Sequence, residues 1–198
     1  MAAAPPVPEL GSGDVGIRLA RTRDAGALQR LLADNREWLR PWEATHPTVQ
    51  LQEPGSFPMR PAVKAMLRQY RLGLGVPFVI TYRGEVVGQL SLSGISGGSL
   101  SSAQIGYWVS AAVAGRGITT LAVALATDYC LFWRGLHRVE ICIRPENRAS
   151  LRVVEKLGFR PEGIRERYIH IDGDWRDHES FALTAEDVPE GVLNRFLS

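Results

Sequence analysis

Val109-Ser-Ala-Ala-Val-Ala-Gly-Arg-Gly-Ile-Thr-Thr120 leads directly into an apolar run at residues 121–133. Residues 104–109 read as a strand, so we expect a strand, a short loop and a helix that begins inside the loop. The first N–H groups of a helix have no partner within it, and the peptide dipoles add positive charge there. Gly115 and Gly117 let the backbone approach a ligand closely, and Arg116 adds a permanent charge. The stretch therefore predicts a site for a phosphate or pyrophosphate.

The spacing of this loop differs from those of two well-known nucleotide-binding loops. The chain contains neither G-x-x-x-x-G-K-S/T nor G-x-G-x-x-G after a strand. A pair of glycines also marks ordinary turns, so these residues alone leave a plain turn as an alternative. The prediction rests on the order of the elements: a strand, V-x-x-x-x-x-G-R-G-I, and a long apolar helix.

The bulk properties indicate one globular domain. The chain has 198 residues, of which 45% are hydrophobic, enough to bury a full core. Its 23 basic and 21 acidic residues give a net charge of +2 without a Lys/Arg block, so we expect no direct binding of nucleic acid. Cys130 and Cys142 are too few for a disulfide scaffold, and no residues have metal-ligand spacing, so no metal is expected.

The beginning of the chain and its apolar runs bear on its location. Residues 1–13 are rich in Ala, Pro and Gly, and we expect a flexible tail there, followed by a single domain at 14–198. This start lacks the features of a signal peptide, and no apolar run approaches the roughly 18 residues of a membrane span. We therefore expect no membrane association and a cytoplasmic location.

Hydrophobic periodicity predicts a mixed α/β sheet covered by helices. The predicted strands lie at 16–20, 77–82, 85–92, 104–109, 138–144, 168–171 and 175–183. The predicted helices begin after Asp24, at Met59, inside the glycine loop and after Asn147, with a short amphipathic end at 185–198. One face of the long helix is expected to carry Leu121, Leu125, Tyr129 and Phe132. Residues 46–58 read as a loop.

Three further segments resemble one enzyme family. Residues 136–159 read L-H-R-V-E-I-C-I-R-P-E-N-R-A-S-L-R-V-V-E-K-L-G-F, which is similar to the LHRVE…PEN-x-x-S…EKLGF segment of the RimJ/RimL group. Residues 160–163 resemble the segment that follows it there. Residues 35–43 resemble that group's N-x-x-x-L-x-P-W turn, which lines the acceptor site. From about Gly16 to Thr184 the chain resembles the GCN5-related N-acetyltransferases (GNAT), and the RimJ/RimL group among them.

The resemblance implies a fold and a reaction. The GNAT fold is an α/β fold with a mixed, mostly antiparallel sheet of about seven strands, splayed in the middle and flanked by helices. The pantetheine arm of acetyl-CoA, the co-substrate, inserts where two strands separate. A primary amine attacks the thioester directly, without a covalent enzyme intermediate. Dimers are common among relatives, which leaves a homodimer open, although no sequence feature decides it.

Positions of the family's CoA site carry over to this chain. Val109 would pair its backbone with the pantetheine arm, the N–H groups of residues 115–120 would hold the pyrophosphate, and Asn147 and Ser150 would lie near the thioester. The implied CoA-binding residues are Val109, Ala114, Gly115, Arg116, Gly117, Ile118, Thr119, Thr120, Asn147 and Ser150. Arg152 and Lys156 could meet the 3′-phosphate, although solvated helix faces are the more usual reading.

The chain departs from the family pattern at several positions. The motif Q/R-x-x-G-x-G/A begins here with Ala114 and ends with Thr119. Backbone donors survive either change. Many members carry a tyrosine that protonates the leaving thiolate, and this chain has Val154 at that position. Some RimL-type enzymes carry a catalytic glutamate on the following strand, where this chain has Ile169.

Three residues are candidates for the proton chemistry. Ser150 could donate its hydroxyl to the departing sulfur, or could bond its own helix backbone instead. Glu43, in the presumed acceptor segment, could act as the base or bind the substrate ammonium; the alternative is a solvated loop carboxylate. Glu140 lies among apolar strand residues, where a raised pKa would suit a base, but an ion pair with a neighbouring arginine is the alternative.

The acceptor is predicted from amine chemistry. Trp38, Trp42, Tyr168 and His170 are candidate walls of the acceptor site, with core packing or a structural histidine as alternatives. An α-amine titrates at about 7.7–8.0 and a lysine at about 10.4, so a neutral lysine at pH 7 costs about 3.5 kcal/mol more. A chain without an obvious base therefore fits a protein N-terminal amine, and the RimJ/RimL resemblance implies a ribosomal protein as the acceptor. The alternatives are a small amine such as an aminoglycoside or polyamine, succinyl transfer, and an acyl-CoA-binding module without catalysis.

Overall fold

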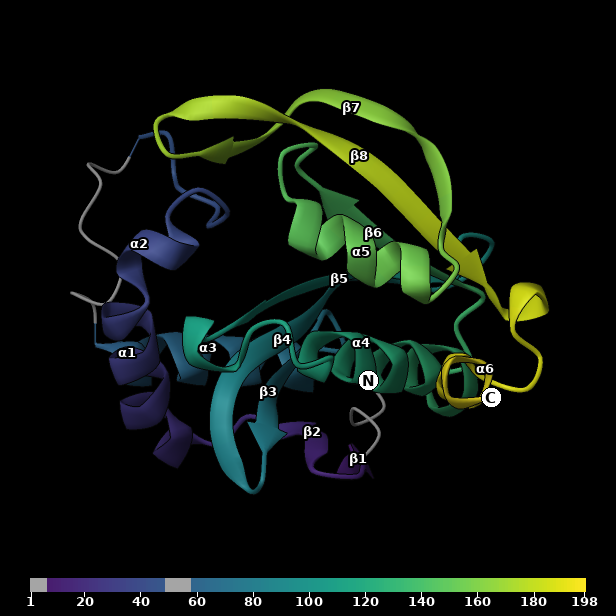
Figure 1. Cartoon of the computed structure of the whole chain (residues 1–198), viewed down its shortest axis with the longest axis horizontal. Helices are drawn as coiled ribbons and strands as arrows, with labels where there is room; N and C mark the ends of the chain where they lie inside the picture. The colour runs from purple at the N-terminus through teal and green to yellow at the C-terminus, as the bar shows by residue number, and fades with distance from the viewer. Residues whose placement is uncertain (1–6, 49–57) are drawn as a thin grey trace.

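A computed structural model describes residues 7–48 and 58–198. Eight strands form a single sheet in the order β1-β2-β3-β4-β5-β6-β8-β7 (Figure 1). The strands are β1 (Leu10–Ser12), β2 (Val15–Leu19), β3 (Val76–Tyr82), β4 (Glu85–Ser96), β5 (Ser102–Val109), β6 (Arg138–Ile143), β7 (Arg160–Ile171) and β8 (Asp174–Thr184). The helices are α1 (Ala25–Asp34), α2 (Arg36–Leu39), α3 (Met59–Arg71), α4 (Ile118–Asp128), α5 (Arg148–Lys156) and α6 (Val192–Leu197).

The sheet is antiparallel except at its centre, where β5 and β6 run parallel. These two strands pair only from Ser102 with Arg138 to Gln104 with Glu140. Beyond that point both strands continue, to Val109 and Ile143, without pairing to each other. The expected mixed, mostly antiparallel and splayed sheet is therefore confirmed.

Alternating side chains of β3 separate two hydrophobic layers. Phe78 and Ile80 point into the main core, which also contains the buried sides of α4, α5 and α6. Val79, between them, points into a smaller core with Leu28 of α1 and Val63 of α3. Because successive strand residues face opposite sides, α1 and α3 cover one face of the sheet and α4 and α5 the other.

The pair β4–β5 requires a glycine near the splayed end. Gly88 of β4 pairs with Val109 of β5. A Cβ at Gly88 would collide with the carbonyl oxygen of Trp108. This close approach fixes the end of β5 from which the glycine loop departs.

The amino-terminal prediction is corrected in part. Residues 7–13 were expected in a flexible tail, but Leu10–Ser12 form β1, antiparallel to β2. Three residues carry too weak a periodicity to be recognised without the partner strand, and they make the eighth strand where about seven were expected. Residues 1–6 of the tail and 49–57 of the predicted loop lie outside the described residues.

The end of the long helix also differs from the prediction. The chain continues from α4 into a π-helical turn at Tyr129–Trp133. A π turn holds more residues than an α turn, so later side chains rotate away from the buried face. Tyr129 is buried as expected, but Phe132 is 51% exposed.

The carboxyl terminus packs against α4. The Asp128 carboxylate accepts the backbone N–H groups of Val192 (2.6 Å) and Leu193 (3.0 Å) at the start of α6. The predicted amphipathic end is thus confirmed, and it is bound to the helix that carries the glycine loop. None of the helices described at 7–48 and 58–198 combines the length and apolar character needed to cross a membrane.

Candidate active site

The glycine loop forms an uncapped helix start, as predicted. Gly117 is the N-cap of α4, with φ 77° and ψ −3°, and Gly115 has φ 76°. Both are left-handed conformations that favour glycine. No side chain in the described parts of the chain caps this end, and a Cβ at either glycine would meet nothing within 4 Å. The first N–H groups of α4 therefore border open space, which fits a bound phosphate.

The remaining loop residues anchor this helix start. Ile118 and Thr120 are buried, so the first turn of α4 is held in the core, while Arg116 is exposed. Ala114 and Thr119, the two departures from the family motif, are half-buried. The loop thus has a fixed base and an exposed tip, the arrangement that the pyrophosphate prediction requires.

The junction of α1 and α2 is tied to the first residues of this loop. The buried Asn35 Oδ1 accepts the Ala111 N–H (2.7 Å) and the Ser110 hydroxyl (3.2 Å). The Trp38 indole N–H donates to the carbonyl of Val109 (3.1 Å). The predicted acceptor segment and the predicted CoA loop are therefore joined by three hydrogen bonds.

An Asn35→Ala variant should be less stable and bind CoA more weakly. It leaves the buried Ser110 hydroxyl and the Ala111 amide without their acceptor, which costs about 2 kcal/mol. For a chain of this size that loss lowers Tm by about 5 °C. Scanning calorimetry and CoA titration measure both effects, with the exposed Asn194→Ala as the control. An unchanged Tm and an unchanged CoA affinity would contradict the tether.

Residues 36–45 lie across the ends of three strands. Trp38 contacts the end of β5. Next to the end of β6, Arg144 donates to the Pro41 carbonyl (2.7 Å) and places its guanidinium 5.5 Å from the centre of the Trp42 ring. Ala44 pairs with Ile171 at the end of β7. Figure 1 shows α2 at the same end of the molecule as the β7–β8 hairpin.

His170 fastens this segment to β7. Its Nδ1 lies 2.7 Å from the Thr45 hydroxyl oxygen, and its backbone carbonyl accepts the Thr45 N–H (2.8 Å). Its ring also meets the Trp175 ring edge-on at 5.6 Å between centroids. These contacts favour the structural reading, and the substrate contact stays a prediction.

Glu43 has the electrostatic character of a base. Burial raises the pKa of its carboxyl, and the charge of Arg36 offsets only part of that effect. The nearest Arg36 nitrogen lies 3.8 Å from the carboxylate, beyond ordinary hydrogen-bond length. A raised pKa makes this carboxylate a stronger proton acceptor than an ordinary glutamate, as a general base requires.

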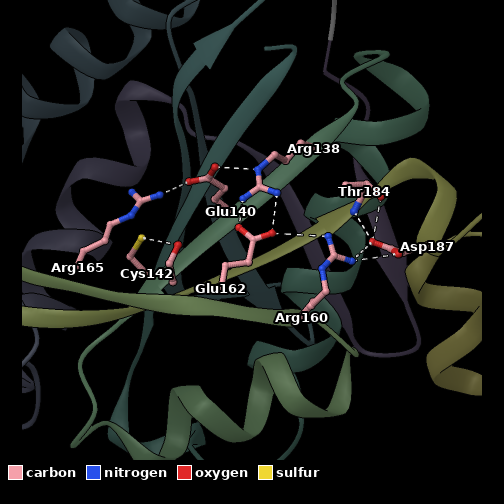
Figure 2. Close-up of polar contacts among 9 residues, drawn as sticks. Arg138, Glu140, Cys142, Arg160, Glu162, Arg165, Thr184 and Asp187 are labelled. Atoms are coloured by element: carbon pink, nitrogen blue, oxygen red, sulfur yellow. Dashed lines mark hydrogen bonds and ion pairs between the residues drawn. The ribbon is translucent and has the colours of Figure 1, made fainter. Parts of the chain in front are cut away.

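Glu140 differs from the prediction of a raised pKa. Burial raises the pKa of this carboxyl, but hydrogen bonds and charges from Arg138 and Arg165 outweigh it, and the net shift is downward. Each arginine lies 2.8 Å from one carboxylate oxygen. Figure 2 shows Glu140 within a row of alternating charges that continues through Arg138 to Glu162 and Arg160. The alternative reading, an ion pair, is therefore confirmed.

Tyr168 lies over the point where β5 and β6 separate. Its hydroxyl oxygen accepts from Arg165 (3.0 Å) and from the Gln104 side chain (3.4 Å). Gln104 and Glu140 form the last pair before the splay. Because two donors occupy the phenol oxygen, the Tyr168 proton remains to be donated, which suits a wall that bonds a substrate carbonyl.

Ser150 is held by the predicted cap. The Asn147 Oδ1 accepts the Ser150 backbone N–H (3.1 Å) at the start of α5. Asn147 therefore makes the capping hydrogen bond. Within the described residues, the Ser150 hydroxyl makes no hydrogen bond to the helix backbone. Val154 is 1% exposed within the main core, so this position supplies no polar group.

Sequence reasoning missed Tyr107, Arg144 and Arg165. Tyr107 follows the β5 alternation with Ile105 and Val109, a signal that could have placed it on the α5 side of the sheet. Arg144 ends the strand predicted at 138–144, but its contacts with Pro41 and Trp42 cross about a hundred residues of sequence. No local pattern indicates such a contact.

The sequence matches a family model and several known proteins. Residues 14–160 match the family model described as acetyltransferase (GNAT) domain. The chain is 30% identical over 178 residues to (ribosomal protein uS5)-alanine N-acetyltransferase of Escherichia coli (strain K12), covering 88% of this chain and 90% of that protein. It is 42% identical over 103 residues to probable N-acetyltransferase YjcK of Bacillus subtilis (strain 168), covering 52% of this chain and just over half, 57%, of YjcK.

A solved structure matches the whole fold. Mycobacterium smegmatis RimJ, in complex with CoA-disulfide, superposes with a TM-score of 0.90 at 37% identity. The match covers 100% of this chain and 96% of that chain. The likeness therefore includes both the glycine loop and the β7–β8 hairpin.

Proposed function

Because the chain belongs to the GNAT family of N-acetyltransferases, we propose that it transfers the acetyl group of acetyl-CoA to the N-terminal α-amine of a protein. The observation that carries the proposal is that residues 35–45 contact the CoA loop, Arg144 next to the end of β6, and the end of β7. A chain end presented to this segment would meet Trp38, Trp42 and Tyr168 beside the splayed strands. The name of the E. coli relative supports a ribosomal protein as the acceptor, and hence action in the cytoplasm.

The CoA loop would hold the donor through backbone groups. The N–H groups of residues 115–120 would bind the pyrophosphate, and Val109 and Asn147 would flank the pantetheine arm. Acetyl-CoA supplies the activated acyl group when bound. The uncapped start of α4, with its open surroundings, supports this assignment.

Glu43 and Ser150 would divide the proton chemistry between them. The Glu43 carboxylate would accept the proton that the amine loses as the new C–N bond forms. Its raised pKa supports this role over that of Glu140, whose carboxylate already serves two arginines. The Ser150 hydroxyl would donate a hydrogen bond to the sulfur that leaves, since the Asn147 side chain already caps α5.

Release of CoA thiol across an acceptor panel tests the proposal. The panel contains a peptide beginning with alanine, free alanine, an amino-blocked lysine peptide and a polyamine. We expect rapid release with the alanyl peptide and little with the blocked lysine peptide, because a neutral lysine costs about 3.5 kcal/mol more at pH 7. Equal turnover of α- and ε-amines would contradict the α-amine assignment.

A further inference from the structure

Tyr107 has a hydroxyl group to which the proposed function assigns no role. It lies in β5 between Gln104, the last residue paired with β6, and Val109, where the CoA loop begins. Its ring packs against the main core, on the side of the sheet that α4 and α5 cover. The phenol is therefore in the splayed part of the sheet, on the side from which α5 presents Ser150.

The Tyr107 hydroxyl is buried, and it has no hydrogen-bond partner with acceptable geometry among the described residues. Burial raises the pKa of this phenol to about 12, and the Ser150 side chain is the neighbouring group that offsets part of the effect. The contact with Ser150 is thus close but short of ideal geometry, and the phenol keeps its proton at physiological pH.

A buried donor without a partner is costly, so such groups call for an explanation. A hydroxyl has one proton and can accept through its lone pairs. If the Tyr107 O–H donates to the Ser150 oxygen, the Ser150 proton has to point away from the phenol. The Ser150 backbone is fixed by the Asn147 cap, which leaves rotation of this hydroxyl as the remaining freedom.

We propose that Tyr107 is a positioning residue that donates to the Ser150 oxygen and thereby turns the Ser150 proton toward the departing sulfur. This rests on the proposed role of Ser150. As the amine nitrogen forms the C–N bond and the C–S bond breaks, the Ser150 O–H donates to the sulfur that receives the electron pair. Tyr107 keeps its own proton throughout. Solvent protonates the released thiolate, since a thiol with an ordinary pKa of about 8.5 takes up a proton near neutral pH.

A double-mutant cycle of Tyr107→Phe and Ser150→Ala tests this inference. Tyr107→Phe keeps the ring and should lower kcat about tenfold, the size of one hydrogen bond, with KM for acetyl-CoA within about twofold. Ser150→Ala should lower kcat at least as much, and adding Tyr107→Phe to it should change nothing further. Tm should not fall in Tyr107→Phe, because the variant removes a buried hydroxyl that lacks a complete bond. Tyr82→Phe, on the β3–β4 hairpin, is the matched control.

The outcomes separate this inference from the role of Ser150. Unchanged kcat in Tyr107→Phe, with a slow Ser150→Ala, overturns the positioning role alone. Losses that multiply in the double variant overturn it as well, because Tyr107 would then act independently. Full activity of Ser150→Ala removes the proposed role of Ser150 and the inference that rests on it. A lowered Tm in Tyr107→Phe, with kcat per CoA-binding site unchanged, would make Tyr107 structural and overturn the inference.

Discussion

A Gly117→Val variant should bind CoA about 100-fold more weakly than the unmodified chain. Gly117 has φ 77° at the N-cap of α4, where an L side chain is strained by roughly 1–2 kcal/mol. The added side chain would also fill the open space that the first N–H groups of α4 border. Loss of two hydrogen bonds to a charged phosphate, at about 1.5–3 kcal/mol each, corresponds to a factor of about 100 or more. Isothermal titration with CoA measures the change.

Gly84→Val provides the matched control for this experiment. Gly84 has φ 83° in the hairpin between β3 and β4, and a Cβ there also meets nothing within 4 Å. Both variants carry a similar backbone strain, so any difference in CoA affinity reports the ligand contact at the loop. We expect Gly84→Val to lose stability but keep its CoA affinity. Equal affinity of the Gly117 variant and the unmodified chain would remove the loop from the CoA site.

A Glu43→Gln variant should lose about 100-fold in kcat/KM at pH 7 with an α-amine peptide, within the range of a positioned base. Burial raises the pKa of Glu43, and only the deprotonated carboxylate can accept the amine proton. In the unmodified enzyme, kcat/KM should therefore fall as pH drops through a value above the ordinary 4.5 of a glutamate. Glutamine cannot titrate, so this component of the acid limb should disappear, and the fall caused by protonation of the α-amine near its ordinary pKa of about 7.7–8.0 should remain. Steady-state kinetics from pH 5 to 9 show both effects.

Glu140→Gln is the control that separates the two carboxylates. The pKa of Glu140 is lowered on balance, so it is ionised across the working range and contributes no acid limb there. The variant leaves Arg138 and Arg165 without a shared partner and should melt at a lower temperature. Its pH profile should keep the limb assigned to Glu43. Loss of that limb in Glu140→Gln, and its survival in Glu43→Gln, would exchange the two roles.

Local chemistry accounts for the helix starts and the strand that the sequence predicts correctly. The start of α4 follows from a left-handed glycine next to an apolar run, and the start of α5 from an asparagine that caps the helix. Both signals act within a few residues. The strand predicted at 138–144, which forms β6 at Arg138–Ile143, was likewise recognisable, because Val139, Ile141 and Ile143 alternate along one face.

The features that were missed depend on distant partners. Burial raises the pKa of Glu140, and Arg138 together with Arg165 lowers it on balance; Arg165 lies on β7, far from Glu140 in sequence. The role proposed for the Tyr107 hydroxyl depends on Ser150, which α5 places beside it only in the folded protein. The strand β1 forms because it pairs with the edge of β2. Phe132 is exposed because the chain changes from an α-helix to a π-helical turn before it. In each case, tertiary packing overrides or completes a weak local signal.

Locating the acetyl group on a two-amine peptide tests the central claim most directly. The peptide begins with alanine, contains one internal lysine, and is incubated at pH 7 with acetyl-CoA and the enzyme. Tandem mass spectrometry then assigns the product. The account predicts acetylation of the α-amine, with the lysine unmodified. Acetylation of the lysine, or an unmodified peptide beside an active control reaction with a small amine, would contradict it.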